Sequence, residues 1–435
     1  MRSPASRLFI GGADEAAPGS QRVGEDGAAD VRHRIGDDLP LPDRAVDAIA
    51  CGASVASSVP SLRVPLLLEC RRVLRAGGRL SIAVPEGAAG EWRRLLRLAG
   101  FAETAAAGAG RAGLEAVKRE RAMSDAPLVS VLIPAFHPRF FAEALDSALA
   151  QTWRPLEIVV GDDSPGPEIE AIARSRDGAV PIRYERNPAR LRTRRNSVGC
   201  FERAQGEFVK FLHDDDLLAP ACVETLLGAF RASPDVTLAT SVRTLVDEEG
   251  RPFPDQPSNR PILDGTRLVA GHSLANAMIG AGLNVVGEPS TVLFRRDDLA
   301  DQAPGYFRFD EVEGHGIFDM VTWSALLMRG DAVVFGEPLS RTRVHPHHDR
   351  APDLGERTVA SLRGLQDAWL ALGVFDRIPP NLVVTKRWPL RDGDAWRLER
   401  VRTFAPQDAT PQARLAEWRK ERAASPAIAG AARTR

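Results

Sequence analysis

The sequence lacks the features of a disulfide-bonded, zinc-ribbon or nucleic-acid-binding protein. Its four cysteines, at positions 51, 70, 200 and 222, show neither C-x-x-C nor paired spacing, so neither a disulfide framework nor a zinc site is expected. The 57 Lys+Arg and 58 Asp+Glu nearly cancel, leaving a formal net charge of -1. This balance offers no general attraction to nucleic acid or to an anionic membrane, so an anionic ligand must be held by local groups.

Long hydrophobic runs are also missing. The first residues lack the apolar core of a signal peptide. The most apolar window, residues 268–287, contains His272, Asn276, Asn284 and four glycines, and is too polar for a spanning helix. We therefore expect no transmembrane segment, a buried or substrate-lining role for this window, and a cytoplasmic protein, with association at the inner face of the membrane left open.

A chain of 435 residues exceeds the size of a single core, so two or three domains are expected. Residues 1–120 alternate short apolar runs with helical patterns, which is typical of an α/β fold with a parallel sheet. The predicted strands lie at 8–10, 46–50 and 80–84, with an edge strand at 114–117. A helix over 64–74 is expected to stop at Gly77-Gly78. Residues 121–127 are predicted to be a linker.

The second block, residues 128–350, repeats the β-α-β-α order. Its strand patterns lie at 128–133, 158–160, 182–184 and 208–212, separated by helical patterns. Aspartates follow two of these strands, so both clusters are expected at the carboxyl edge of a parallel sheet, where ligands of open α/β folds bind. Residues 351–435 are predicted to form a helical C-terminal extension with a polar tail.

The run Asp214-Asp215-Asp216 follows the largely apolar segment Phe208–Leu212 after one residue, His213. Adjacent carboxylates repel one another, and a divalent cation that they share relieves the repulsion. Oxygen ligands suit Mg²⁺ or Mn²⁺, metals that commonly act on phosphate groups. The alternative is a turn that caps the helix expected near Pro220, because Asp is a good N-cap residue.

Four ordered motifs of this block resemble family 2 glycosyltransferases. They are Val129-Ser-Val-Leu-Ile-Pro-Ala-Phe136, Ala144-Leu-Asp-Ser-Ala-Leu-Ala-Gln-Thr152, Glu157-Ile-Val-Val-Gly-Asp-Asp-Ser164 and Gly206-Glu-Phe-Val-Lys-Phe-Leu-His-Asp-Asp-Asp216. The resemblance covers about residues 127–350 and implies a GT-A nucleotide-diphospho-sugar transferase fold.

The resemblance assigns a donor side to the site. It implies that Asp163 contacts the nucleotide base, Asp214 the ribose and Asp215 the metal, with Asp216 in support. His213 stands where an acidic residue is commoner, and a structural or a ligand role is open for it. Further donor-side candidates are Pro134, Phe136, Arg195 among the basic residues 192–195, Arg343 on the diphosphate, and His345 on phosphate or metal.

The resemblance also assigns an acceptor side. Asp319, preceded by Phe318 where Glu is usual, is the candidate general base, with a helix N-cap as its alternative role. Glu288 and Ser290 are expected to hydrogen-bond acceptor hydroxyls, and Trp323 to line the acceptor side. His345, His347 and His348 could suggest zinc, but no second ligand cluster accompanies them, so zinc is not expected.

The first block carries a second resemblance. Residues 39–49, 69–82 and 98–101 resemble the second half of class I S-adenosylmethionine methyltransferases. Ala13 and Asp14 depart from the Gly-x-Gly turn of that family, and only Glu25 or Asp26 could replace its ribose-binding carboxylate. We therefore expect a degenerate methyltransferase-like domain that does not bind S-adenosylmethionine.

Together these observations predict an inverting, metal-dependent glycosyltransferase with Mn²⁺ or Mg²⁺ as cofactor. Its partners would be a nucleotide-diphospho-sugar donor and a glycan, lipid-linked or protein acceptor, in the setting of bacterial surface polysaccharide synthesis. The alternatives are a bifunctional glycosyltransferase and methyltransferase, and a non-catalytic relative that binds nucleotide sugars.

Overall fold

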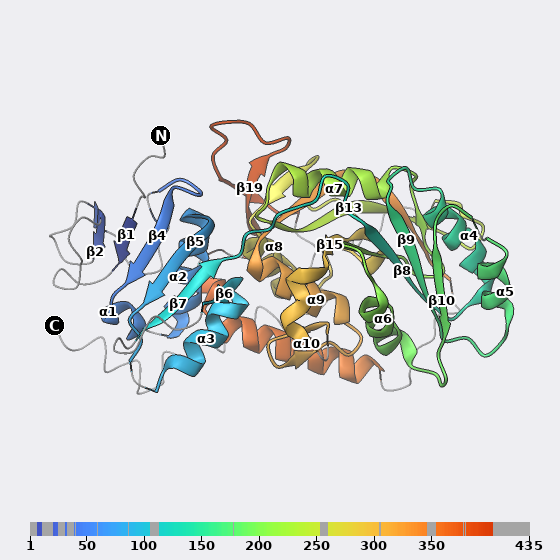
Figure 1. Ribbon diagram of the computed structural model, residues 1–435, viewed down its shortest axis with the longest axis horizontal. Coiled ribbons are helices and arrows are strands. Elements are labelled where there is room, and N and C mark those ends of the chain that lie inside the picture. Colours follow the sequence, from blue (N-terminus) through green and yellow to red (C-terminus); the bar gives the residue numbers. More distant parts are fainter. Residues whose placement is uncertain are drawn as a thin grey trace.

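The described residues of the structure, a computed structural model, form two large β-sheets that lie side by side along its long axis (Figure 1) and a two-stranded third sheet. The structure describes residues 7–402 except 11–20, 25–30, 33–38, 40, 59, 86, 105–112, 177, 253–259, 304–305, 346–353, 377 and 379. The first sheet uses residues 7–118 and the second uses residues 129–400. The candidates Ala13, Asp14, Glu25, Asp26, His347 and His348 lie outside the described residues.

The first sheet has the strand order β3-β2-β1-β4-β5-β7-β6. Its strands are β1 (Arg7–Ile10), β2 (Gln21–Gly24), β3 (Val31–Arg32), β4 (Val46–Cys51), β5 (Leu74–Ile82), β6 (Phe101–Glu103) and β7 (Leu114–Lys118). Strands β1 to β5 pair in parallel in the 3-2-1-4-5 order of doubly wound folds, and β7 runs antiparallel to β5 and β6. The segments 11–20 and 25–30 are shorter than the crossover of a dozen or more residues that usually joins parallel strands.

Two details of this sheet differ from the sequence-based expectation. The strand over 114–117 was expected at an edge, but β7 lies between β5 and β6, and β6 is the edge. Helix α2 (Pro60–Val73) ends before Gly77, which belongs to β5 and adopts φ +72°. Glycine is needed at this strand position, because other residues rarely adopt positive φ. Helices α1 (Ala53–Ala56) and α3 (Ala89–Leu98) complete the first domain.

The second sheet is centred on strands that are buried on both faces. Its path is β10 (Ile182–Arg186), β9 (Leu156–Asp162), β8 (Val129–Ala135), β11 (Phe208–Phe211), β15 (Leu293–Arg295), β13 (Val236–Val246), β18 (Asp331–Arg343), β14 (Arg267–Val269), β19 (Leu382–Arg387) and β20 (Arg397–Arg400), with β12 (Leu217–Leu218) paired to β18. Every residue of β8, β9 and β11 is buried, as expected for parallel strands covered by helices.

Two hydrophobic clusters cover the second sheet. One contains residues of α4 (Pro138–Leu149), α5 (Glu168–Arg174) and α7 (Cys222–Ala232). The other contains residues of α6 (Arg192–Arg203), α8 (Gly271–Ala281), α9 (Phe318–Arg329) and α10 (Leu354–Ala371). The window 268–287 is thus largely the buried helix α8. Short elements fill the remainder: β16 (Arg308–Phe309), β17 (Val312–Glu313), and the 3-10 helices Pro289–Thr291, Arg296–Gln302 and Val374–Asp376.

The C-terminal segment is not simply the expected helical extension. Among its described residues, which end at 402, α10 is the one long helix, and β19 and β20 then extend the second sheet beyond β14. The alternating burial of β19, with Val383 and Thr385 inward, accounts for this strand. Among the described residues, no helix combines the length and apolarity that crossing a bilayer requires.

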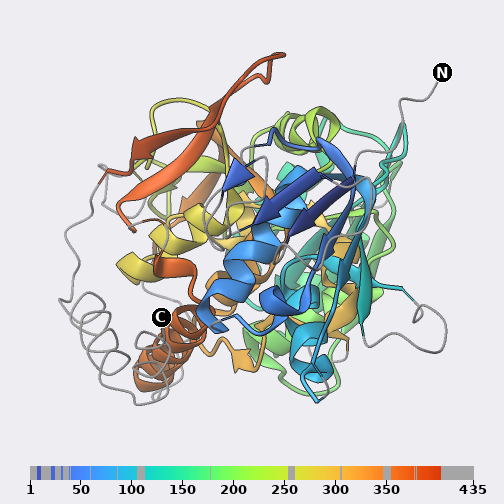
Figure 2. The same cartoon turned by 90° about the vertical axis from the view of Figure 1, so that its left-hand side faces the viewer.

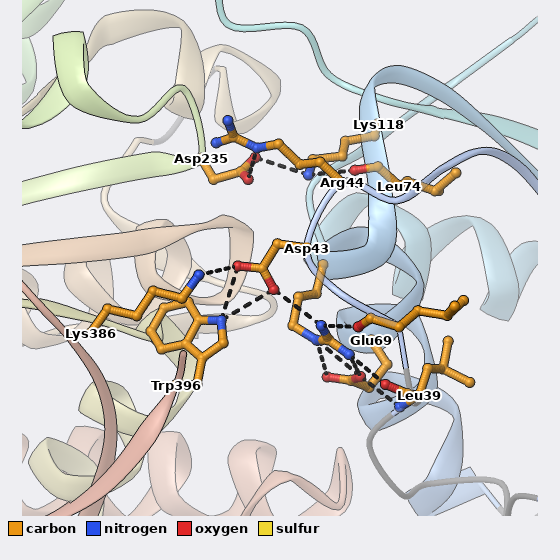
Figure 3. A network of polar contacts seen from close by, with 11 residues as sticks. Leu39, Asp43, Arg44, Glu69, Leu74, Lys118, Asp235, Lys386 and Trp396 are labelled. Carbon is orange, nitrogen blue, oxygen red and sulfur yellow. Dashed lines mark hydrogen bonds and ion pairs between the residues drawn. The ribbon is translucent and has the colours of Figure 1, made fainter. Parts of the chain in front are cut away.

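One of the two hydrophobic clusters is shared by both sheets. A single cluster extends from Ile49 and Trp92 in the first domain to Leu326 and Met328 in α9. Figure 3 shows the polar contacts beside it: Asp43 lies next to Lys386 and Trp396. Arg72 of α2 also donates to Asp43, at 3.1 Å. The same view shows Asp235 next to Arg44 and Lys118. The domains are therefore joined by apolar burial and by charged pairs together.

Asp235 is the carboxylate that neutralises a buried lysine at this interface. The Lys118 side chain is 1% exposed, and its Nζ lies 3.0 Å from Asp235 and donates to the Leu74 carbonyl at 2.9 Å. Burial raises the pKa of Asp235, but Lys118 and Arg44 outweigh it, and the pKa is lowered overall. A carboxyl group whose pKa is lower in the folded than in the unfolded protein stabilises the fold at pH values above its unfolded pKa. This stabilisation is lost as the pH falls through the folded pKa, so the interface weakens in acid.

We predict that Asp235→Asn lowers the free energy of unfolding by about 3 kcal/mol, because it leaves the Lys118 ammonium buried without its counter-ion. Denaturant unfolding at neutral pH measures the loss. Asp47→Asn is the matched control, since it removes an exposed pair with Arg75 that contributes about 0–1 kcal/mol. Equal effects of the two variants would contradict the assignment.

Candidate active site

The candidate site lies at the carboxyl ends of β8, β9 and β11. An open pocket is lined by Pro134, Phe136, His137, Asp163, Arg192, Thr193, Asn196, His213, Asp214 and Asp215. The parallel register of the three strands brings these ends to the same edge of the sheet. The pocket thus has the position at which open α/β sheets bind ligands.

Asp214 fastens the end of β8. Its Oδ2 accepts hydrogen bonds from the backbone N–H groups of Phe136 and His137, both at 2.6 Å. Burial and the neighbouring Asp215 raise the pKa of Asp214 to about 6, although the two N–H donors lower it. Asp214, expected near a ribose, therefore lines the pocket and also orders the strand end that forms its wall.

The side chains of His213, Asp215 and Asp216 form the candidate metal group. One ligand atom from each lies within 4.8 Å of the others. Nε2 of His213 is buried and has no hydrogen-bond partner among the described residues. An imidazole nitrogen without a partner, beside two carboxylates, fits a divalent cation with oxygen and nitrogen ligands such as Mn²⁺. The ligand role that the sequence left open for His213 is thus supported by its position.

His345 lies behind this group. Its Nε2 is 2.9 Å from Oδ2 of Asp215. A histidine that contacts a carboxylate in this way orients it, so His345 is placed to support Asp215. His345 is not part of the three-residue group, and its role as a ligand of metal or phosphate stays a prediction. Asp216 accepts a hydrogen bond from the backbone N–H of Arg343 at 3.0 Å. Burial of the Asp216 carboxyl and, to a smaller extent, repulsion from Asp215 raise its pKa to about 7.

Arg343 does not face the pocket, contrary to the expectation that it contacts the diphosphate. Its side chain is 2% exposed. Nε donates to the backbone carbonyl of Asp215 at 3.1 Å, and Nη2 pairs with Glu143 at 2.8 Å. The guanidinium also lies over the ring of Phe140 at 4.3 Å. Arg343 therefore fastens the aspartate turn to α4, and its donors are used within the protein.

Asp163 orders the loop that leads into α6. Its carboxylate accepts the backbone N–H groups of Leu191 at 2.7 Å and Arg192 at 2.8 Å, and the amide of Asn187 at 3.1 Å. Arg192 adopts φ +64°, and these bonds hold that strained conformation. The predicted base-binding carboxylate thus lines the pocket while shaping its rim.

The first turn of α6 supplies the cationic side of the pocket. Arg192, Thr193 and Asn196 line it, whereas Arg195 is exposed and is not a lining residue. A helix N-terminus favours anions because its first N–H groups lack intrahelical partners. The basic run 192–195 therefore signalled the correct segment, but Arg192 and not Arg195 reaches the site.

The candidate base Asp319 lies in the first turn of α9. Asn284 donates to its Oδ2 at 2.7 Å, and the Met320 N–H to its Oδ1 at 2.8 Å. Burial, followed by repulsion from Glu288, raises the pKa of Asp319 to about 6, while His213 lowers it electrostatically. Asp319 is not among the residues that line the pocket, and His213 is the member of the metal group whose charge acts on it.

Two of the expected acceptor contacts are buried instead. Trp323 is 1% exposed, and its indole N–H donates to the Gly287 carbonyl at 3.0 Å, so it positions residues 284–288. Ser290 is fully buried, and its hydroxyl accepts the His213 backbone N–H at 3.0 Å. Neither side chain is free for an acceptor. Glu288 is half-buried and pairs with Arg243.

Some site residues were not singled out from the sequence. His137, Thr193, Arg243 and Asn284 belong to no motif that marks them. His137 follows the Pro-Ala-Phe stretch that ends β8, and this position was the available signal. The others depend on contacts between segments far apart in the chain.

Comparison with known proteins agrees with this geometry. Residues 130–299 match the family model described as "Glycosyl transferase family 2". The chain is 32% identical over 272 residues to the uncharacterized protein MT1568 of Mycobacterium tuberculosis, a match that covers 59% of this chain and 79% of that protein. It is 28% identical over 233 residues to the uncharacterized glycosyltransferase RT0329 of Rickettsia typhi, covering 50% of this chain and 64% of that protein.

Among solved structures, S. aureus TarS 1-349 in complex with UDP aligns with a TM-score of 0.42 and 18% identity, over 55% of this chain and 65% of that one. The matches thus span less than two thirds of the Rickettsia protein and of the TarS chain. The chain belongs to glycosyl transferase family 2 through its central domain. Its central domain is therefore a glycosyltransferase domain of this family.

We predict that His213→Ala weakens Mn²⁺ binding by about tenfold or more, because it removes one member of a three-residue group. Titration of free Mn²⁺ followed by electron paramagnetic resonance gives the affinity. His315→Ala, a histidine outside the pocket, serves as control. Unchanged affinity in His213→Ala would restrict the metal site to carboxylates.

Proposed function

We propose that the protein is an inverting, metal-dependent glycosyltransferase that moves a sugar from a nucleoside-diphosphate donor to a hydroxyl of a glycan, lipid-linked or protein acceptor. The observation that carries the proposal is one pocket edge where the group His213, Asp215 and Asp216 meets the N-terminus of α6, with Asp319 nearby. The cellular setting we propose, surface polysaccharide synthesis at the cytoplasmic face of the membrane, follows from the family resemblance alone.

The donor side of the pocket suits a diphosphate. Bound Mn²⁺ or Mg²⁺ would stabilise the negative charge that grows on the leaving phosphates. His213, Asp215 and Asp216 would hold the metal, while Arg192 and the first turn of α6 would face the phosphates. Phe136 offers a ring for the nucleotide, with Arg190 over its other side at 4.2 Å.

The acceptor side requires a base. In the proposed step, the acceptor oxygen forms a bond to the anomeric carbon, the bond from that carbon to the diphosphate oxygen breaks, and the hydroxyl proton passes to Asp319. Asn284 and the Met320 N–H each donate to one carboxylate oxygen of Asp319, and together they fix the orientation of the carboxylate. A pKa near 6 leaves the carboxylate ionised at neutral pH yet more basic than an ordinary aspartate.

We expect EDTA treatment or Asp215→Ala to abolish both donor hydrolysis and sugar transfer, because the leaving diphosphate loses its counter-charge. A thermal-shift screen of nucleotide sugars with and without Mn²⁺ identifies the donor first, since a ligand that binds only the native state raises its melting temperature. If the enzyme turns over the donor identified in this screen without any metal, this mechanism is excluded. A donor that binds but is never turned over would favour the non-catalytic alternative.

Asp319→Asn should lower kcat by about 10²–10⁴-fold while leaving donor KM nearly unchanged. In the wild type, kcat/KM should fall about tenfold per pH unit below pH 6, because the base is protonated there. Stopped assays across pH 5–8 measure both effects. Asp297→Asn, an exposed aspartate outside the site, is the control. If the fall in kcat/KM below pH 6 persists unchanged in Asp319→Asn, the base is a different residue.

For the first domain, we propose a degenerate methyltransferase-like fold. The parallel 3-2-1-4-5 order supports the fold, and the short segments 11–20 and 25–30 argue against a complete cofactor-binding half. Isothermal titration with S-adenosylmethionine distinguishes the readings: no heat of binding is expected, and micromolar binding would favour the bifunctional alternative.

A further inference from the structure

Helix α9 begins at the candidate base and ends at the first domain. The last four carbonyl groups of a helix have no intrahelical partner. Here Leu326 O accepts the Thr237 hydroxyl at 2.7 Å, Met328 O accepts Arg71 Nη1, and Arg329 O accepts Arg121 Nη2 at 3.3 Å. Arg71 belongs to α2 and Arg121 follows β7. Two of these three donors therefore come from outside the second sheet.

The first domain also contacts the end of α9 through its backbone. Gly100, in the turn between α3 and β6, has φ +85°, and a Cβ there would lie 2.9 Å from the Arg329 carbonyl oxygen. Arg71 Nη1 donates to the neighbouring Ala99 carbonyl at 3.2 Å as well as to Met328 O. A single buried guanidinium thus joins the turn of the first domain to the last turn of α9.

A third contact lies on the turn between β16 and β17, the two short strands that precede α9. Arg94 of α3 forms a two-pronged pair with Asp310, with one bond at 2.7 Å. Asp310 adopts φ +53°, an unfavourable conformation for a residue other than glycine. The hydrogen bond to Asp310 raises the pKa of Arg94, as expected for a strong pair. The first domain therefore holds the segment before α9 as well as its far end.

We infer that the first domain positions α9, so that Asp319 is held toward the donor pocket, and that Arg71 and Arg94 are the positioning residues. This inference rests on the proposed role of Asp319. Its physical basis is that cations at a helix C-terminus satisfy the free carbonyls and complement the helix dipole. Burial lowers the pKa of Arg71 to about 10, which still leaves it charged at neutral pH.

The first domain thereby gains a role that needs no methyl transfer. The contacts to α9 come from α2, α3 and the segment after β7, whereas the donor pocket is built from β8, β9, β11 and α6. A loss of these contacts should therefore change the acceptor-side helix and leave donor and metal binding intact. That separation makes the role of the domain measurable.

The test uses the full-length protein and the variants Arg71→Met, Arg71→Lys and Arg94→Ala, with Arg75→Ala as control because Arg75 pairs only at the surface of the first domain. Hydrogen–deuterium exchange should rise about tenfold at amides 318–329 in Arg71→Met, with β8 and β11 unchanged. The kcat for transfer should fall about tenfold, while donor KM and Mn²⁺ affinity stay within about twofold. Arg71→Lys should restore part of both, and Arg75→Ala should resemble the wild type.

Unchanged exchange in α9, or an increase spread evenly over the chain, would overturn the inference. If Arg71→Met does not fold, the same exchange and kcat measurements are made on Arg94→Ala. Its half-exposed side chain pairs with Asp310 in the turn between β16 and β17, before α9. Localised exchange in α9 together with a wild-type kcat would also overturn the positioning role. If exchange in Arg71→Met rises only in α9 but Asp319→Asn retains full activity, the first domain does position α9, and the proposed role of Asp319 as the base is wrong.

Discussion

The site depends on how the protein holds three adjacent carboxylates in a buried turn. Asp214 is held by two N–H groups at the end of β8, Asp215 by His345, and Asp216 by the N–H of Arg343. Each partner comes from a different part of the chain from the turn itself. Contacts from the ends of both β8 and β18 therefore offset the repulsion within the turn, and the geometry of the candidate metal group depends on both strand ends.

The sequence was sufficient for features that depend on local pattern. The buried strands β8, β9 and β11 read as continuous apolar runs, and the aspartates that follow β9 and β11 fall at their carboxyl ends as expected. The order of elements then placed Asp163 and Asp214 in one pocket. These predictions succeed because the local hydrophobic pattern and the parallel order together fix which end of each strand faces the ligand.

Features that depend on distant partners were not readable. The resemblance of the segment ending in Arg343 and His345 to the family's closing segment suggested a phosphate contact, but Arg343 pairs with Glu143, 200 residues away, and is buried. Trp323 was expected at the acceptor side, yet its indole contacts Gly287 inside the protein. Residues 382–400 form strands because β14 offers them an open edge. In each case the partner, and not the residue type, decides the role.

The contact between Asp43 and Lys386 also has a consequence for how the chain assembles. These residues are 343 positions apart, so this part of the domain junction can close only after Lys386 has been synthesised. Contacts of such long sequence separation form slowly, because a large loop must close before they contribute. The first domain is therefore synthesised well before the strand that supplies Lys386, and until then Asp43 lacks this counter-ion.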